Sequence, residues 1–251
     1  MKPTLYLEKN LFTEDELQDT SKIISEYFNI HEINMNAIIG GRINLNRVQF
    51  GRFSLNIAKF IKRDYSFSNC LKWVPAFREY TLSPRNTYFN DISYFINCYN
   101  YFDFPIFLRP CDGFKSFAGQ VFPNKERLIE EFNFMTKNKN LDPYTMCMTS
   151  SIKKIDREWR TIFVNNEYCS GSQYLVNDEL QLSSAIPSKV IKFATKIGKN
   201  SYFDNIFNYC VDICESDGKL HLLEINSFES SSFYAADLNK IYSAWSKFYD
   251  D

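Results

Sequence analysis

The alternation of apolar and polar positions is clearest near the end of the chain, over residues 207–226. Two runs rich in Val, Ile, Leu, Phe and Tyr flank residues 216–219, Ser-Asp-Gly-Lys. Asp-Gly between such runs is a strong signal for a β-hairpin. The runs are interrupted by Asp212, Glu224 and Asn226, and a carboxylate buried in a strand costs free energy unless a cation or hydrogen bonds hold it. The hairpin therefore predicts either a cation site or a sheet edge with one wet face.

The register of this hairpin decides between the two interpretations. Because side chains alternate between faces, Glu224 and Asn226 share one face of their strand. With a two-residue turn at Asp217-Gly218, Asp212 lies opposite Leu223 and faces away from them. A three-residue loop, or a bulge with the turn glycine in the left-handed region, places it opposite Glu224 instead. In that register three oxygen ligands meet on one face, a set typical of Mg²⁺ bound together with phosphate oxygens.

Weaker periodicity precedes the hairpin in the first hundred residues. Alternation over residues 4–8 predicts a strand, and the capping-box pattern at residues 13–16 predicts that a helix follows. Residues 31–52, which contain Arg42, Arg47 and Arg52, fit two turn-linked strands with a basic face, or a solvated surface that carries arginines. A short helix is expected over residues 56–63. Residues 64–103 are rich in aromatic side chains and show no periodicity from which an element can be predicted.

At residue 104 the pattern becomes regular. A short apolar strand ends at Arg109-Pro110, a loop over residues 111–116 carries Lys115, and a second strand over residues 117–122 precedes a helix capped by Asn124. Cations at the two ends of a loop are suited to close over a polyphosphate, with the loop mobile before binding. The spacing is not that of a Walker motif, and a solvated loop lysine is the alternative.

The rest of the chain alternates strands and helices. Glu158 and Arg160 fall on one face of a strand, and a serine-rich loop follows Asn226. The predicted strands span residues 144–152, 155–165, 167–175 and 205–214, and the predicted helices span residues 187–199 and 238–248.

Composition limits the class of protein. A length of 251 residues allows one large domain or two modest ones. With 29 Lys and Arg against 30 Asp and Glu, the net charge gives no indication of nucleic acid or an anionic membrane as a partner. No apolar run reaches the roughly 18 residues of a membrane span, and the first residues turn acidic where a signal peptide has its apolar core. We therefore expect a cytoplasmic protein.

The cysteines and histidines offer one alternative metal site. Seven scattered cysteines in apolar surroundings indicate reduced, mostly buried thiols. Cys210, Cys214 and His221 share the hairpin, so a zinc site is the competing interpretation. The spacing lacks a CxxC pair, and only three soft ligands are near.

Three motifs follow one another in a known order. They are R-P-x4-K-S-F-x-G from Arg109, the triplet Glu158-Trp159-Arg160, and D-x11-E-x-N from Asp212 to Asn226. Over residues 104–240 this order resembles the ATP-grasp superfamily, and in particular a small bacterial and phage branch with arginine at the first nucleotide-binding lysine. The resemblance implies an α+β fold in which two lobes with antiparallel sheets hold ATP between them. It also implies a small α/β N-terminal domain over residues 1–103 and an ATP-grasp domain over residues 104–251, with a lid lobe (104–150) and a metal-binding, catalytic lobe (151–251).

The resemblance also assigns roles to residues. Arg109 and Lys115, with Ser116 beside them, would contact the ATP phosphates. Arg160 would hold the transferred phosphoryl and acyl groups, and Glu158 would position Arg160 or a substrate amine. The Mg²⁺ ligands would be Asp212, Glu224 and Asn226. The adenine hinge would lie over residues 148–152, with Ser150 and Ile152 as contacts, and this segment lacks an obvious acidic contact for the ribose.

The implied function is an ATP- and Mg²⁺-dependent ligase that joins a carboxylate to an amine, with an amino acid, peptide or protein side chain among the possible substrates. Phosphoryl transfer is catalysed mainly by positioning and charge neutralisation, which agrees with the acidic and basic residues found. Two alternatives stay open. One is a non-catalytic ATP-grasp-like protein that binds a partner through its aromatic N-terminal half, and the other is phosphotransfer to a hydroxyl group.

Overall fold

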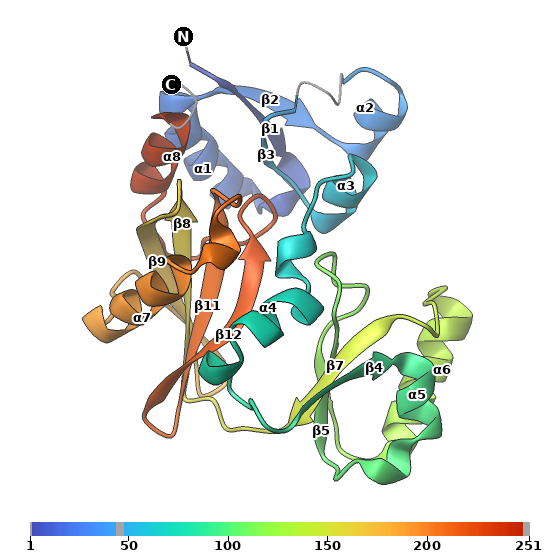
Figure 1. Ribbon diagram of the computed structural model, residues 1–251. Coiled ribbons are helices and arrows are strands. Elements are labelled where there is room, and N and C mark those ends of the chain that lie inside the picture. The colour runs from blue at the N-terminus through green and yellow to red at the C-terminus, as the bar shows by residue number, and fades with distance from the viewer. Residues whose placement is uncertain (1, 44–47, 248–251) are drawn as a thin grey trace.

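The computed structural model describes residues 2–43 and 48–247 of the chain. Three sheets organise it, and helices pack beside each of them (Figure 1). The N-terminal sheet lies at the top of that view, a five-stranded sheet lies below it, and a four-stranded sheet lies at the lower right. Among residues 2–43 and 48–247, no helix combines the length and apolar character that crossing a membrane requires.

The N-terminal sheet is parallel and has the strand order β2-β1-β3. The predicted strand and helix at the start are confirmed, and the helix begins at the predicted capping box. Thr13 Oγ1 accepts a hydrogen bond from the Glu16 amide, and the Glu16 carboxylate accepts one from the Thr13 amide. The elements are β1 (Thr4–Glu8), η1 (Lys9–Leu11), α1 (Glu14–Tyr27), β2 (Asn29–Ile33), α2 (Met35–Ile39), β3 (Phe50–Arg52) and α3 (Leu55–Phe60).

Of the two interpretations of residues 31–52, the pair of turn-linked strands with a basic face is wrong. Strands β2 and β3 flank β1 on opposite sides, so they do not pair with each other. Arg47 lies outside the described residues and Arg42 is exposed. Arg52 is buried and donates hydrogen bonds to the carbonyls of Phe228 and Ser231. Its role is therefore internal, because it holds the loop over residues 228–231.

The four-stranded sheet has the order β4-β7-β5-β6, and α5 and α6 lie beside it (Figure 1). Asn124 caps α6 as predicted, and its Oδ1 accepts a hydrogen bond from the Arg127 amide. Strand β4 pairs with β7, so residues before position 104 also belong to this lobe. The elements are β4 (Thr87–Asp91), α5 (Ile92–Asn97), η5 (Tyr99–Tyr101), β5 (Ile106–Pro110), β6 (Gln120–Phe122), α6 (Lys125–Asn138) and β7 (Met146–Ser151).

The five-stranded sheet is antiparallel and has the order β10-β9-β8-β11-β12. Helix α7 covers one face, where Trp159 and Ile213 are buried. Helix α8 covers the other face together with the N-terminal sheet, and Trp245 packs there against Phe28 and Phe50. The elements are β8 (Arg157–Val164), β9 (Glu167–Val176), β10 (Glu179–Ser183), α7 (Ser188–Gly198), η6 (Ser201–Phe203), β11 (Tyr209–Ser216), β12 (Lys219–Ser227) and α8 (Leu238–Lys247).

The hairpin of β11 and β12 contains the bulge that the metal-site hypothesis requires. Its turn is a regular two-residue one, with Asp217 at φ 51° and Gly218 at φ 72°. Pairing is continuous from Ser216 opposite Lys219 to Ile213 opposite Leu222, and then shifts by one residue so that Asp212 lies opposite Glu224. The register is therefore set at the bulge formed by Leu223 and not at the turn.

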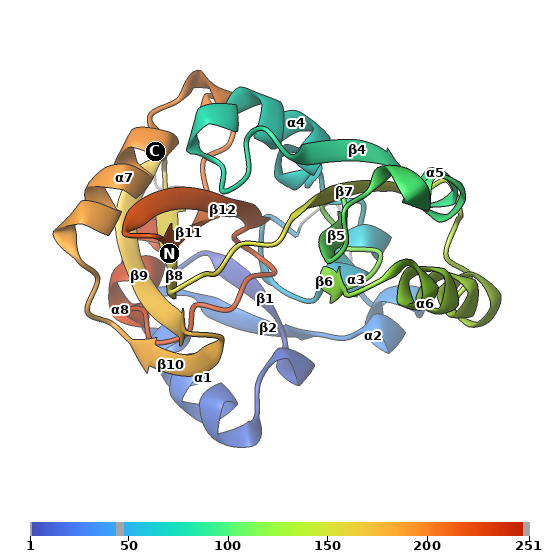
Figure 2. The same cartoon turned by 90° about the horizontal axis from the view of Figure 1, so that it is seen from below.

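A connecting segment joins the N-terminal region to the four-stranded sheet. It consists of η3 (Ser66–Ser68), α4 (Cys70–Ala76) and η4 (Arg78–Tyr80), and α4 lies between the two larger sheets (Figures 1 and 2). Thr81 then forms a single parallel bridge with Leu222 of β12. All seven cysteines lie in the described part of the chain and are free thiols.

Candidate active site

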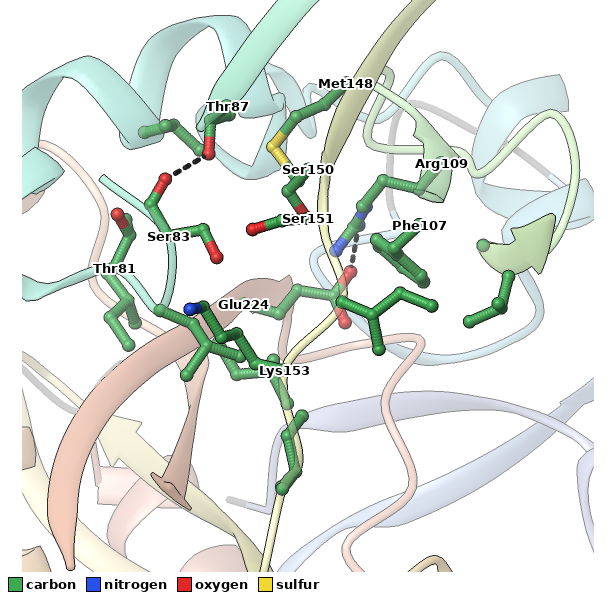
Figure 3. Close-up of a pocket in the computed structure, with 18 of the residues that line it drawn as sticks. Thr81, Ser83, Thr87, Phe107, Arg109, Met148, Ser150, Ser151, Lys153 and Glu224 are labelled. Carbon is green, nitrogen blue, oxygen red and sulfur yellow. Dashed lines mark hydrogen bonds and ion pairs between the residues drawn. The ribbon is translucent and has the colours of Figure 1, made fainter. Parts of the chain in front are cut away.

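A cavity of about 680 Å³ lies between the four-stranded and five-stranded sheets. Side chains of β5, β7, β8 and β12 form its walls, and the connecting segment adds residues from α4 and from positions 81–83. Figure 3 shows Thr81, Ser83 and Thr87 on one side of this cavity and Phe107 and Arg109 on the other. A pocket with apolar walls and a few polar groups is typical of small-molecule sites.

Two cations and one carboxylate meet in the cavity wall. Arg109, near the end of β5, donates a hydrogen bond to Glu224 Oε1, and Lys115 Nζ lies 3.0 Å from the same oxygen. The side chains of Arg109 and Glu224 are largely buried, whereas that of Lys115 is 39% exposed. Burial alone would raise the pKa of Glu224, but Arg109 and Lys115 outweigh burial and lower the pKa to about 2. Glu224 is therefore ionised at neutral pH.

A second ion pair lies beside the first on the same face of the five-stranded sheet. Asp212 lies between Glu224 on β12 and Arg160 on β8. The Arg160 guanidinium donates to both oxygens of Asp212, each at 2.8 Å, and Asn226 Nδ2 donates to Asp212 Oδ2 at 2.9 Å. Arg160 also donates to the Ser232 carbonyl. Asp212, Arg160 and Asn226 are buried, and Asp212 accepts three hydrogen bonds in all. The role of Asp212 as a third Mg²⁺ ligand stays a prediction.

The oxygen atoms available here suit Mg²⁺. Glu224 supplies a carboxylate, and because the amide nitrogen of Asn226 donates to Asp212, its oxygen is the atom left for a cation. Mg²⁺ is usually held by one or two carboxylates together with substrate phosphates, which this set matches. The zinc interpretation has no such support, since no group of three or more His, Cys, Asp or Glu side chains in the described ranges is placed to hold a metal ion.

Contacts within the loop between β5 and β6, and with the connecting segment, hold this loop in place. Asp112 accepts hydrogen bonds from the amides of Phe114 and Ser116 and from the Ser116 hydroxyl. Ser116 therefore faces Asp112 and does not line the cavity. At Gly113 a Cβ atom would lie 2.3 Å from Ser68 Oγ and 2.4 Å from the Tyr65 carbonyl oxygen, so the loop packs tightly on η3. Its movement on nucleotide binding stays a prediction.

Glu158 lines the cavity, and its hydrogen-bond partner is Tyr174. Its carboxylate accepts a hydrogen bond from Tyr174, whereas the carboxylate partner of Arg160 is Asp212. Burial raises the pKa of Glu158 despite the hydrogen bond from Tyr174. Glu158 precedes Arg160 by two positions on β8, so it lies nearer to the segment that connects β7 to β8. Glu158 thus lies on the strand face expected for it, and its role toward Arg160 or a substrate amine stays a prediction.

The predicted hinge is also at the cavity. Met148, Ser150 and Ile152 line it, and Ser150 lies between Thr87 and Phe107 in the sheet. Sequence reasoning missed the contributions of the connecting segment and of the β9–β10 turn. Neither segment contains a motif that distinguishes it from an ordinary loop, and Asp178 is a single charged residue. The lining residues missed include Trp73, Val74, Thr81, Ser83, Lys153, Tyr174, Asp178 and Leu222.

Several solved structures share this architecture, and one of them is named an ATP-grasp ligase. The D-cycloserine synthetase DcsG matches with a TM-score of 0.65 at 12% identity, covering 98% of this chain and 99% of that one. The D-alanine–D-alanine ligase from Bacillus anthracis matches with a TM-score of 0.57 at 11% identity, covering 100% and 95%. The ATP-grasp ligase PsnB, solved with a minimal precursor, matches with a TM-score of 0.59 at 8% identity, covering 97% and 98%. The fold is therefore the ATP-grasp fold, as the sequence motifs indicated.

The sequence itself identifies the family. Residues 86–244 match the ATP-grasp domain of R2K clade family 2, and the chain belongs to this family. The match begins immediately before β4, so it includes the whole four-stranded sheet. No curated protein matches the sequence.

Proposed function

We propose that this protein is an ATP- and Mg²⁺-dependent ligase that joins a carboxylate to an amine. The observation that carries the proposal is the meeting of Arg109, Lys115 and Glu224 in the wall of one cavity, next to the Asp212–Arg160 pair. Burying four or more charges costs free energy, and a protein that only binds a partner gains nothing from this arrangement. The ATP-grasp fold and the family of the chain support the same function.

The cations of the cavity wall would bind the phosphate groups. Arg109 offers a planar fork of donors and Lys115 a flexible point charge, and both form ion pairs with Glu224. When phosphate oxygens replace the carboxylate as partners of the two cations, Glu224 becomes available to a metal ion. Glu224 and Asn226 would then hold Mg²⁺, which neutralises charge on the phosphate oxygens as the terminal phosphoryl group moves.

Arg160 would act at the reacting groups. In the proposed reaction, a carboxylate oxygen of the substrate attacks the γ-phosphorus of ATP and ADP leaves. The amine nitrogen then attacks the acyl carbon, inorganic phosphate leaves, and the amine loses a proton. Asp212 fixes the guanidinium of Arg160 by two hydrogen bonds, so the charge is oriented before substrate binds. Arg160 would stabilise the negative charge that develops in both steps.

Glu158 would bind the nucleotide rather than position Arg160. It lies in the cavity wall, two positions before Arg160 on β8 and nearer to the segment that connects β7 to β8. Its side chain lines the same cavity as Arg109, Lys115 and the hinge residues Ser150 and Ile152. A carboxylate there is suited to accept hydrogen bonds from the ribose hydroxyls, which would supply the acidic contact that the hinge sequence lacks.

The proposal is tested by incubating the protein with ATP, Mg²⁺ and pooled amino acids and metabolites. The readouts are ADP formation and mass spectrometry of the products. A ligase gives ADP together with a new amide mass, and Glu224→Gln abolishes both signals. ADP with a phosphorylated product and no amide would establish the phosphotransferase instead. ATP binding without turnover on any pool would favour the non-catalytic binding protein.

A further inference from the structure

Two tyrosines from different parts of the chain stack on each other beside Arg160. Tyr174 lies on β9 and lines the cavity, and Tyr234 lies in the loop between β12 and α8. Their ring centroids are 4.9 Å apart, and the ring planes differ by only 12°. The guanidinium carbon of Arg160 lies 5.8 Å from the Tyr174 centroid and 5.2 Å from the Tyr234 centroid. At these distances an aromatic ring attracts a cation, so Arg160 interacts with both rings of the pair.

The hydrogen bonds of Arg160 leave part of its guanidinium for a ligand. Its Nε and Nη2 each donate to Asp212, and its Nη1 donates to the Ser232 carbonyl at 3.0 Å. Each terminal nitrogen of an arginine carries a second N–H, which here is left for phosphoryl or acyl oxygens. A guanidinium is planar, so these donors reach a reacting group only if the plane is held at the right tilt.

The backbone of Tyr234 has a conformation that bulky residues seldom adopt. Its φ is 50°, in the left-handed region, where glycine has no steric cost and an aromatic residue does. Two hydrogen bonds to β9 hold the loop here, from the Ala235 amide to Ser172 Oγ and from the Asp237 amide to Ser170 Oγ. Strained backbone persists only where the surroundings hold it, and it is concentrated at functional sites. The Tyr234 ring is therefore kept beside Arg160 at a cost in free energy, which indicates a function for the ring.

The tyrosine pair differs from the other stacked rings of the molecule. Tyr209 stacks on Phe163 and on Phe203, but that stack is buried in the core beneath α7. Tyr174, in contrast, lines the cavity, and its hydroxyl donates to Glu158. The pair thus connects the guanidinium to the cavity wall.

We propose that Tyr234, through its stack with Tyr174, positions the Arg160 guanidinium for the reaction. This inference rests on the proposed role of Arg160 at the reacting groups. Asp212 fixes one edge of the guanidinium, and the two rings limit its tilt about that edge. Tyr234 is a positioning residue in this account, because it acts through Arg160. Its loss should therefore slow the chemical step and leave the binding of ATP unchanged.

The test compares Tyr234→Gly with Tyr234→Phe in the full chain. Glycine suits the positive φ and removes the ring, whereas phenylalanine keeps the ring and removes only the hydroxyl. NMR of protein labelled with ¹⁵N-arginine, without added nucleotide, gives the rate at which the Arg160 Nε proton exchanges with water. This proton forms the hydrogen bond to Asp212 Oδ1. Its exchange should be about tenfold faster in Tyr234→Gly and unchanged in Tyr234→Phe.

ADP release with the acceptor pools named above gives the functional readout. The kcat should fall about tenfold in Tyr234→Gly while the KM for Mg-ATP stays at the wild-type value, and Tyr234→Phe should keep both values. Tyr168→Leu is the matched control, because Tyr168 is a half-buried tyrosine of β9 that packs against Phe163 on the face beneath α7. This control should lower the Tm and leave the exchange rate and kcat unchanged.

Wild-type exchange and kcat in Tyr234→Gly would overturn the inference, and so would equal losses in Tyr234→Gly and Tyr234→Phe. A higher KM with an unchanged kcat would also overturn it, because the ring would then contribute to the binding of ATP. If the wild-type protein releases no ADP with any pool, the proposed function fails. The exchange rates then decide by themselves whether Tyr234 holds Arg160.

Discussion

The two charged groups of the site are built on different principles. In the Glu224 group, one carboxylate is shared between Arg109 and Lys115, and Lys115 is 39% exposed, so these charges can change partners when a ligand binds. In the Arg160 group, Asp212 accepts two hydrogen bonds from the guanidinium, and two tyrosines lie beside it, so this pair keeps its partners. Changes to the Arg160 group should therefore cost most in stability, and changes to the Glu224 group should cost most in turnover.

The largest expected effect concerns the ion pair of the Arg160 group. Asp212→Ala removes the carboxylate that Arg160 contacts at 2.8 Å with two nitrogens, and leaves a buried guanidinium without its counterion. The free energy of unfolding should fall by about 3–5 kcal/mol. Urea denaturation measures it, with Asp204→Ala on the exposed surface as the control. A loss equal to that of the control would show that Arg160 does not depend on this pair.

Next in size is the effect of Glu224→Gln on turnover. The substitution keeps the size of the side chain but removes the charge that we assign to Mg²⁺. Mg-dependent ATP turnover should fall by at least about 100-fold, as for other losses of charge stabilisation at a reacting centre. Glu215→Gln on the neighbouring strand, where Glu215 pairs with Lys189, should keep wild-type turnover. Equal rates for the two variants would remove Glu224 from the proposed site.

Gly113→Ala is expected to have an effect of intermediate size on stability and on Mg-ATP binding. A Cβ atom at this position would lie 2.4 Å from a backbone oxygen of Tyr65, and backbone cannot move aside easily. Gly113→Ala should lower stability by about 1–3 kcal/mol and weaken Mg-ATP binding, because the loop that carries Lys115 must shift. Thermal unfolding and calorimetry measure the two effects. Wild-type affinity in this variant would mean that the docked loop position is not needed.

A pH titration isolates the contribution of the Glu224 group. The pKa of Glu224 is lowered from 4.5 to about 2, so its favourable contribution to folding is complete above pH 4.5. As the pH falls from 4.5 toward 2, the carboxylate protonates and that contribution is lost. Glu224→Gln should therefore lose less stability than wild type over this range, and Tyr234→Phe, beside Arg160, should lose as much as wild type. Parallel curves for wild type and Glu224→Gln would contradict the assignment.

The smallest effect is expected at the hairpin turn. Gly218 has a positive φ, but no atom lies within 4 Å of the position that a Cβ atom would occupy, and the register is set at Leu223. Gly218→Ala should cost about 1 kcal/mol through backbone strain alone. The Kd of Mg-ATP should stay at the wild-type value. A weakened affinity would show that the turn controls the register of Asp212 and Glu224 after all.

The carboxylates of both groups were accessible to sequence reasoning because charges in apolar strands are conspicuous. Asp212 and Glu224 interrupt buried strands. Because side chains alternate between the faces of a sheet, the two carboxylates share a face only if the hairpin contains an odd-length loop or a bulge. The bulge at Leu223, which meets this condition, has no sequence signal of its own, since leucine also fits a regular strand. Helix α6 was predicted because Asn124 and its apolar spacing agree, and local signals of this kind act within one element.

The tyrosine pair beside Arg160 was not accessible in the same way. Tyr174 and Tyr234 stack only because hydrogen bonds hold the loop after β12 against β9. Strand β4 was missed for a similar reason, because its pairing with β7 and not its own periodicity defines it. Glu158 was placed on the correct face, but its hydrogen bond from Tyr174 was not predicted. Contacts between residues far apart in the sequence determine these three placements, and a single sequence does not reveal such contacts.

The central claim is that phosphate oxygens replace Glu224 as partners of Arg109 and Lys115, and that Glu224 then binds Mg²⁺. Calorimetric titration of wild type and Glu224→Gln with ATP, with and without Mg²⁺, tests it most directly. Without Mg²⁺ we predict that Glu224→Gln binds ATP more tightly than wild type, because the carboxylate no longer competes for the two cations. With Mg²⁺ the order should reverse. Weaker binding by Glu224→Gln under both conditions, or equal binding by the two proteins, would contradict the claim.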